Sequence, residues 1–267
     1  MSARGFRGAL RGEFIKAGTL PAVWVGLVVS VLGTAVVAVL NSVQSLAAIR
    51  AGDAGGYGSS SVVETAFAGA PLGAVGAVVI GVILVSSEYS ANSPDAGGGR
   101  QITTTRIALP GAAGIVLAKV AVVLAVVFAA AVLSAVACLS VAYMLLGDAA
   151  TETDAYASMA SRAAGSGLYW MLTGLLASGI TLITRNGTIP LLVLILNSSV
   201  VSVSLLLTNV TSLAHWLPDM AGRRLFGFEE GSVVPGGLDT LPGALVMAAW
   251  SVLALVVGGV LFARRDA

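Results

Sequence analysis

The feature that most constrains this chain is the stretch 112–146, which is apolar almost throughout and contains one charged side chain, Lys119. As a helix rising 1.5 Å per residue it would be about 52 Å long, whereas the hydrocarbon core of a bilayer is about 30 Å thick. Lys119 resolves the excess, because an ammonium group favours the membrane interface while its aliphatic stem extends along apolar surface. We therefore predict a membrane-spanning helix over about 121–145, with its preceding turns outside the hydrocarbon.

The rest of the composition agrees with a membrane protein. Of the 267 residues, 57% are hydrophobic and 10% are charged, and the mean hydropathy is +0.96; about a quarter of the residues are charged in soluble domains. The apolar run 22–40 is too long for the core of a secretory signal, so we expect an uncleaved first span. Cys138 is the only cysteine, which excludes an internal disulfide and a cysteine metal cluster.

The charged residues fall between apolar runs that are each about 20 residues long, the length that one crossing requires. We predict one transmembrane domain, 1–267, of the all-α integral membrane class with six spans. The spans are about 22–42, 69–87, 121–145, 166–184, 189–208 and 242–262. In the second span, small residues at a spacing of four (Gly69 and Gly73, Ala77 and Gly81) should let helices approach closely.

The segments outside the spans also carry patterns. Residues 1–20 place apolar side chains at helical spacing between basic ones, which predicts an amphipathic helix in the interface before a bend at Pro21. We expect external loops over 43–68 and 147–165. The external segment 209–241 has two apolar patches, which predict short helices dipping into the outer interface. These patches are Leu213–Leu217 and Leu225–Phe228.

Lysine and arginine are distributed unevenly between the two sides of this topology. Ten lie on the side of both termini, and four lie opposite: Arg50, Arg162, Arg223 and Arg224. Basic residues are enriched in cytoplasmic segments, so both termini are predicted to be cytoplasmic.

The polar stretch Glu88–Lys119 between the second and third spans is the best candidate for contact with a soluble protein. Gly97–Gly99 followed by Arg100 lacks the ending of a phosphate-binding P-loop and is interpreted as a hinge. The segment Gln101–Leu109 can form about two helical turns, which Pro110 ends. The alternative is a plain solvated loop.

Particular side chains would make that contact. Arg100 and Arg106 could pair with acidic groups of a partner, and Ile102 and Ile107 could add apolar contacts. The threonines are poor helix formers, so the helix would gain order from the partner. The full candidate set is Glu88, Tyr89, Arg100, Gln101, Ile102, Thr103, Thr104, Thr105, Arg106 and Ile107.

No ionisable side chain falls in the middle of a predicted span, which argues against an intramembrane protease, a proton-coupled carrier and a metal pump. His215 alone cannot complete a zinc site. Uncharged polar residues do enter the fourth and fifth spans: Thr173, Ser178, Thr181, Asn197, Ser198 and Ser202. They either hydrogen-bond helices together or line a substrate path. Asn197, an amide at depth, is the first to test.

Several short motifs, in their order and spacing, resemble the ABC-2-type permease subunits of bacterial ABC transporters, particularly actinobacterial ones. The resemblance covers nearly the whole chain. Its motifs are Arg11-x-Glu13-x-x-Lys16, Glu88-Tyr89, the sequence GGGRQITTT over 97–105, Leu109-Pro110, Lys119 and Arg264-Arg265-Asp266. One departure is Gly111-Ala112-Ala113, where such proteins commonly carry a basic residue soon after the Leu-Pro.

The resemblance implies a permease in the bacterial cell membrane that pairs with a second copy or a sister permease, and with two ATPase subunits. ATP and Mg would bind those subunits; this chain would bind no cofactor and would not be an enzyme. The stretch between spans two and three would hold a coupling helix, and 209–241 would hold re-entrant helices. We expect export of a peptide, lipid or antibiotic-like amphiphile, with the lipid bilayer and no nucleic acid as further partners. A non-transporting anchor or assembly subunit and, less favoured, a secondary transporter are the alternatives.

Overall fold

The computed structural model of the chain describes residues 3–52, 61–90, 101–108, 111–150, 156–197, 202–227 and 236–265. The regular elements among these residues are all helices. Five helical stretches are long and apolar enough to cross a membrane: Pro21–Ala51, Val62–Tyr89, Ala112–Leu146, Tyr156–Thr184 and Thr240–Arg265. They indicate a multi-pass membrane protein.

The chain order of the elements begins with α1 (Ala3–Thr19), α2 (Pro21–Val28), the π-helical turn η1 (Val29–Gly33) and α3 (Thr34–Ala51). Next come α4 (Val62–Phe67), α5 (Ala70–Ser86), η2 (Ser87–Tyr89), α6 (Gln101–Ala108), α7 (Ala112–Leu146), η4 (Gly147–Ala149) and α8 (Tyr156–Thr184). The remaining elements are α9 (Thr188–Asn197), α10 (Val203–Thr208), η5 (Ser212–Trp216), α11 (Pro218–Gly222), η6 (Arg223–Phe226) and α12 (Thr240–Arg265).

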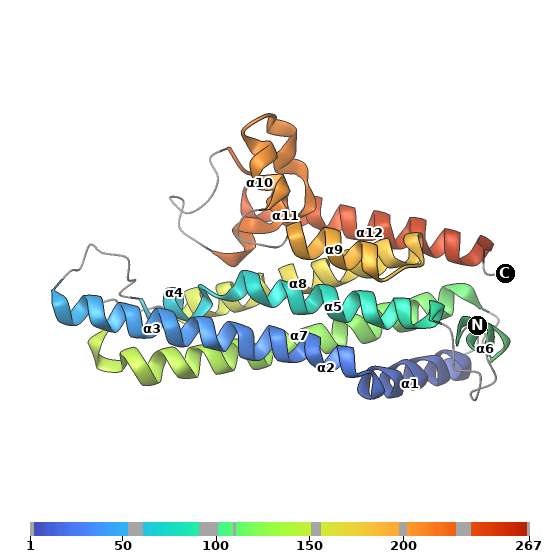
Figure 1. The fold of residues 1–267 in the computed structure, drawn as a ribbon, viewed down its shortest axis with the longest axis horizontal. Coiled ribbons are helices and arrows are strands. Elements are labelled where there is room, and N and C mark those ends of the chain that lie inside the picture. Colours follow the sequence, from blue (N-terminus) through green and yellow to red (C-terminus); the bar gives the residue numbers. More distant parts are fainter. Residues whose placement is uncertain are drawn as a thin grey trace.

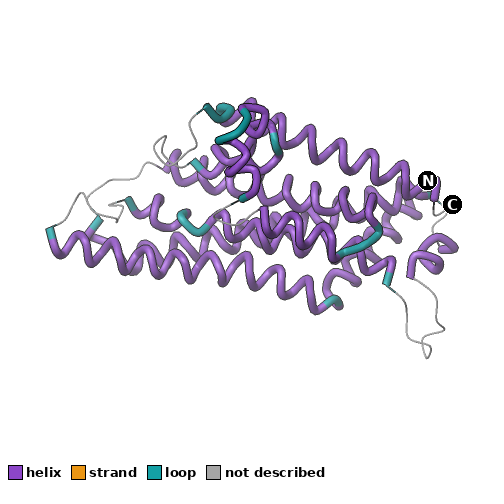
Figure 2. Tube along the Cα trace, turned by 45° about the horizontal axis from the view of Figure 1, so that its top comes forward, coloured by secondary structure: helices purple, strands orange, loops and turns teal. Residues whose placement is uncertain are grey.

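The long helices run alongside one another (Figures 1 and 2). In the most apolar windows of α5 and α8, 67% and 61% of the residues are buried, against 22–33% for the first span, α7 and α12. The helices α5 and α8 therefore form the centre. Around them, α2 packs on α5, α12 packs on α8, and α7 packs on α3 and α8.

Small residues allow the central helices to approach closely, as the second-span pattern predicts. A Cβ atom at Gly81 would collide with the carbonyl oxygen of Gly174, and one at Gly76 would collide with that of Gly26. Trp170 lies directly over Gly73, and its indole N–H donates to the carbonyl of Ala70 at 2.9 Å. Backbones this close leave no room for larger side chains.

Hydroxyl groups add hydrogen bonds across the same contacts. Ser30, buried in the π-helical turn, donates to the carbonyl of Gly73 at 3.0 Å. The hydroxyls of Thr34 and Ser134 lie 2.7 Å apart and join the first span to α7. These bonds connect neighbouring helices without placing a charge in the hydrocarbon.

Two helices extend further than hydropathy predicts. The first span continues to Ala51 in α3, and α8 begins at Tyr156, so parts of the predicted loops 43–68 and 147–165 are helical. The extra turns of α3 bury Ser45, and α4 buries Val62 and Val63. Both α3 and α4 pack against α7, and this packing maintains helix where the sequence is already polar.

The predicted fifth span, 189–208, differs more from the structure than the other spans do. The helix α9 is 10 residues long and ends at Asn197, and the next described helix, α10, begins at Val203. Residues 198–201 lie outside the described part. The predicted short helices of 209–241 correspond to η5 and to α11 with η6, although Phe228 lies outside the described residues. Helices α10 and α11 lie together beside the start of α12 (Figure 1).

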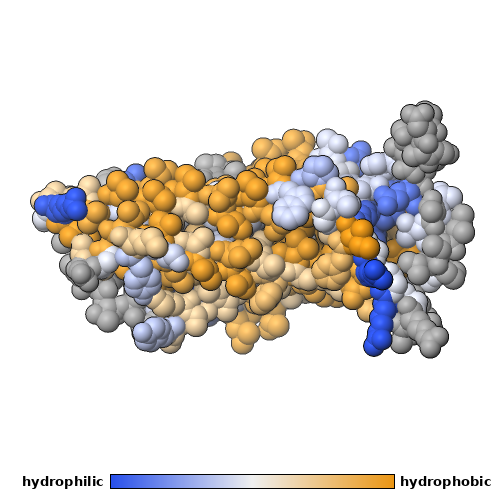
Figure 3. Space-filling model, turned by 90° about the horizontal axis from the view of Figure 1, so that it is seen from below, coloured by the Kyte–Doolittle hydropathy of each residue, from blue (hydrophilic) through white to orange (hydrophobic). Residues whose placement is uncertain are grey.

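The surface separates into two zones (Figure 3). In this view apolar atoms cover most of the length of the bundle. Large apolar side chains are exposed on the first span, α7 and α12, such as Leu32, Phe128 and Leu253. A few hydrophilic atoms lie at one tip of the bundle, and most hydrophilic atoms gather at the opposite end. That end also holds α1, α6 and both termini (Figure 1), and we call it the α6 end.

Candidate functional site

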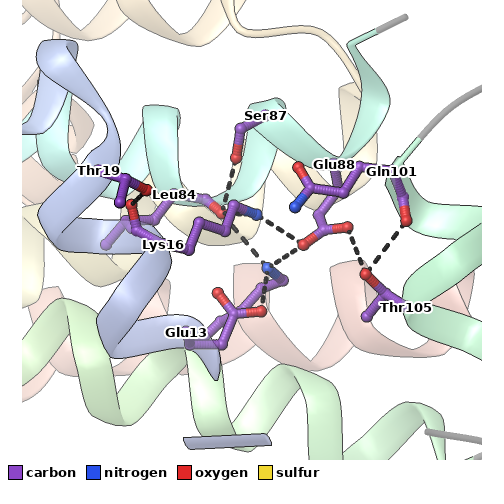
Figure 4. Close-up of polar contacts among 9 residues, drawn as sticks. Glu13, Lys16, Thr19, Leu84, Ser87, Glu88, Gln101 and Thr105 are labelled. Atoms are coloured by element: carbon purple, nitrogen blue, oxygen red, sulfur yellow. Dashed lines mark hydrogen bonds and ion pairs between the residues drawn. The ribbon is translucent and has the colours of Figure 1, made fainter. Parts of the chain in front are cut away.

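Four charged side chains meet inside the α6 end, and we call them the charge cluster: Glu13 and Lys16 of α1, Glu88 of η2 and Lys119 of α7. Figure 4 shows Lys16 of α1 reaching Glu88, and Glu13, on the same helix, reaching the ammonium group that lies between the two carboxylates. The four residues come from three separate parts of the sequence, and 106 positions separate Glu13 from Lys119. The fold alone brings them together.

The carboxylates and ammonium groups alternate at ion-pair distances. The Nζ of Lys119 lies 2.6 Å from Glu13 Oε1 and 2.8 Å from Glu88 Oε1. The Nζ of Lys16 lies 2.6 Å from the same Glu88 oxygen. Both ammonium groups also approach the carbonyl oxygen of Leu84, at 3.4 Å, near the end of α5.

The cluster is buried as well as balanced. The side chains of Lys119 and Glu88 are 3% exposed, and those of Glu13 and Lys16 are 9% and 11% exposed. Two positive and two negative groups cancel, which offsets part of the free-energy cost of removing charges from water. Removing one member would leave an unbalanced buried charge, at a cost of about 3–5 kcal/mol.

Local sequence explains the geometry. Glu13 and Lys16 are three residues apart, so they project from one face of α1. Glu88 follows directly after α5, and Lys119 lies two turns into α7. Burial, together with the neighbouring Lys119 charge, lowers the pKa of Lys16 below its ordinary value, while Glu88 and Glu13 oppose the shift.

The helix α6, which forms where the sequence predicts it, is joined to the cluster through Thr105. The Thr105 hydroxyl lies 3.1 Å from Glu88 Oε2 and 3.2 Å from the carbonyl oxygen of Gln101, and it can donate to either. Because the two lysines occupy Glu88 Oε1, the other carboxylate oxygen is the one that faces α6 (Figure 4). Glu88 therefore contacts α1, α6 and α7 at once.

An apolar contact holds α6 in the same place. Ile102 is 8% exposed and packs in a cluster with buried side chains from four helices. These side chains are Val85 of α5, Ile115 of α7, Leu182 of α8 and Phe262 of α12. A displacement of α6 would disturb the ends of all four helices.

Tyr89 extends the connection to the turn between α8 and α9. The guanidinium carbon of Arg185 lies 6.0 Å from the centroid of the Tyr89 ring, within reach of a cation–π interaction. Because Glu88 and Tyr89 are adjacent, the short η2 turn contacts elements from both halves of the chain.

The structure places the predicted coupling residues as follows. Gln101 and Thr105 are half-buried, Thr103 is exposed, and Ile102 faces the chain's own helices instead of a partner. The backbone of Thr104, Arg106 and Ile107 lies in α6, but their side chains are outside the described part, as is all of Arg100. The described surface that α6 offers to a partner therefore includes Thr103.

The prediction for Lys119 named its preference for the interface but not its partners. Its ammonium group is bound inside the protein by Glu13 and Glu88, at the α6 end of the bundle. The sequence analysis assigned no site role to Glu13, Lys16 or Lys119. An available signal was a lysine inside a long apolar stretch, together with an acid and a base three residues apart in α1.

The polar residues of the fourth span are buried inside the bundle, and one of them, Ser178, bonds to another helix. Thr173, Ser178 and Thr181 are buried, and each donates to the carbonyl four residues earlier, at 2.7–2.8 Å. The Ser178 hydroxyl also lies 3.1 Å from the carbonyl oxygen of Gly81 in α5. The Ser178 contact joins α8 to α5, as the helix-packing interpretation predicts, whereas Thr173 and Thr181 bond within α8 itself.

The candidates near the fifth span connect short helices. Asn197 Oδ1 accepts hydrogen bonds from the backbone N–H of Ser204 at 3.2 Å and from its hydroxyl at 3.0 Å. The hydroxyl of Ser202, which is buried, accepts from the N–H of Leu205 at 3.0 Å and caps α10. Ser198 lies outside the described residues.

A small cavity between α3, α4, α5, α7 and α8 borders none of these candidates. Its polar lining comes from Thr34, Ser134, Cys138, Ser166 and the Trp170 indole. Among the residues that the structure describes, no three His, Cys, Asp or Glu side chains are grouped as metal ligands would be. The charge cluster is thus the most distinctive polar site of the described chain.

Comparison with models of protein families finds no match to this chain, and comparison with curated proteins finds none either.

Proposed function

We propose that this chain is the permease subunit of an ATP-binding-cassette transporter and is driven by separate ATPase subunits. The observation that carries the proposal is the contact between Thr105 of α6 and Glu88 in the charge cluster. A short helix lies at the end of a multi-helix membrane bundle, and a buried charged group joins it to the ends of other helices. Such an arrangement suits the transmission of a push from outside the membrane.

The route of that push follows the contacts. Force on α6 would act on Glu88 through Thr105, and Glu88 shares its other oxygen with Lys16 of α1 and Lys119 of α7. Ile102 would carry the same displacement to α8 and α12. A buried ion pair resists distortion strongly, since separating its members leaves charges without partners. Small movements of α6 would therefore move helix ends together.

The remaining parts of the proposal come from the sequence. The excess of basic residues at the α6 end would place that end in the cytoplasm of a bacterial cell, where ATPase subunits could reach α6. A second permease, identical or related, would complete the transport path. We propose export of a peptide, lipid or antibiotic-like amphiphile.

Co-purification tests the proposal. The chain would be expressed with the ATPase encoded by its genomic neighbour, extracted in mild detergent, and assayed for bound ATPase and for ATP-dependent transport in vesicles. We expect Thr103→Glu to reduce ATPase binding, and we expect the same of the pair Arg100→Glu and Arg106→Glu. Both variants change α6 or its flank while Glu88 itself stays unchanged. Arg50→Glu, at the opposite end of the bundle, is the matched control.

Each outcome decides the matter. An extract that carries no ATPase, or α6 variants that leave binding and transport intact, would show that α6 is not a coupling helix. Bound ATPase without any transport activity would favour the non-transporting assembly subunit.

A further inference from the structure

We propose that α1 binds the anionic headgroups of phospholipids through Arg7 and Arg11. Both side chains are exposed, and neither forms an ion pair with another residue that the structure describes. The only acidic residue of α1, Glu13, is buried against Lys119. The outward face of α1 therefore presents two guanidinium groups with no carboxylate to neutralise them.

The residues of this face share one stripe of the helix. Positions 7, 11, 14 and 18 recur at helical spacing, and Ile15 lies beside them. The opposite stripe contains Ala9, Glu13 and Ala17, which are buried against the rest of the protein. Thus α1 is bound to the protein on one side and open on the other.

Along the open stripe of α1, the side chains change from apolar near α2 to basic toward the N-terminus, which matches the change from hydrocarbon to headgroups at a membrane surface. Phe14 and Ile15 are 44% and 59% exposed and lie toward α2. There Trp24, which is also exposed, donates its indole N–H to the carbonyl of Gly18 at 2.9 Å. Tryptophan favours the interface between hydrocarbon and headgroups. Arg7 and Arg11 lie one to two turns further along α1, away from Trp24, and the proposal assigns them to the level of the phosphates.

Charge then selects the lipid. Anionic headgroups attract a basic side chain at the membrane surface enough to enrich the lipid roughly fivefold per arginine. Zwitterionic headgroups offer no such net attraction. Because the inward face of the same helix holds Glu13 and Lys16, headgroup binding would also press α1 against the charge cluster. The proposal requires only membrane insertion, so it can fail or hold independently of the ATPase partner.

A fluorescent label on α1 tests it. Gly8 lies beside Arg7 and Arg11, and a Cβ atom there meets nothing within 4 Å, so Gly8→Cys can carry a neutral dye without disturbing the packing. The background would be Cys138→Ala. The labelled protein would be placed in nanodiscs of phosphatidylcholine with and without phosphatidylglycerol, and quenching by neutral acrylamide would be measured. We expect the anionic lipid to reduce quenching about twofold or more at low salt, and high salt to reverse the change.

Charge variants provide the controls. Arg7→Gln with Arg11→Gln should abolish the lipid response, whereas Arg7→Lys with Arg11→Lys should preserve it. Arg50→Gln removes a charge at the opposite end of the bundle and should leave the response unchanged. A response in the double glutamine variant equal to that of the parent would overturn the proposal. So would an equal reduction in phosphatidylcholine discs on addition of inorganic phosphate, which would indicate a site for soluble anions.

Discussion

Thr105 of α6 reaches the one carboxylate oxygen of Glu88 that the two lysines of the charge cluster do not occupy. Glu88 thereby uses one oxygen for the membrane bundle and the other for α6. The polar contact between the short helix and the bundle is made at this carboxylate, beside the apolar contact of Ile102. Any change to that carboxylate should act on both the stability of the bundle and the position of α6.

The first prediction concerns Glu88. Glu88→Gln leaves Lys16 and Lys119 with only Glu13 to balance them, and the free energy of unfolding in detergent should fall by about 3–5 kcal/mol. Chemical denaturation followed by circular dichroism measures it. The double variant Glu88→Gln with Lys16→Gln restores the balance and should recover part of the loss. Equal stability of Glu88→Gln and the parent would show that the cluster does not form in the protein.

The second prediction separates the α6 contact from the ion pairs. Thr105→Val keeps the shape of the side chain but removes its hydrogen bond to Glu88, with a loss of about 1 kcal/mol. Hydrogen exchange of the α6 amides should become faster, while exchange in α7 stays the same. Thr103→Val, on the exposed side of α6, is the control and should change neither.

The third prediction concerns the apolar anchor of α6. Ile102→Ala should destabilise the protein by about 2–4 kcal/mol, because the removed groups lie in a buried cluster. Proteolytic cleavage within α6 should also become faster in this variant. If Ile102→Ala left both quantities unchanged, α6 would not be packed against Leu182 and Phe262 as the structure shows.

The fourth prediction uses two glycines with opposite surroundings. Gly81→Ala should destabilise the bundle, because the new methyl group collides with the carbonyl of Gly174. Gly12→Ala lies on α1 with open space around it, and alanine is favoured over glycine in a helix by about 1 kcal/mol. It should be neutral or stabilising. Melting temperatures of the two variants should therefore move in opposite directions or by clearly different amounts.

The positions of helices could be predicted from the sequence wherever a single physical effect determines them. Long apolar stretches predict helices, and α5, α7 and α12 lie where hydropathy places them. Pro110 and the polar run before it predict a short helix, and α6 ends at Ala108. In these places the helix depends on residues close together in the sequence: apolar side chains that favour lipid, or a proline that ends the helix.

The rest depends on contacts between distant residues. The charge cluster requires α1, η2 and α7 to meet, and nothing in the sequence near Lys119 distinguishes a lysine at the interface from one bound by Glu13 and Glu88. The same holds for the ends of α3 and α8, where packing against other helices extends the helix beyond its apolar part. The extended backbone at Ser202, where α10 begins, likewise falls within a run that hydropathy predicts as one continuous span.

The charge cluster also bears on how the chain is made. Synthesis proceeds from the N-terminus, so Glu13 and Lys16 enter the membrane surface first, Glu88 follows the second span, and Lys119 arrives only with the third. Until α7 has inserted, Glu13 lacks the ammonium group that it binds in the finished structure. A chain truncated before Lys119 would therefore hold two carboxylates and one ammonium group at this end of the bundle, and the cluster becomes neutral only when α7 is added.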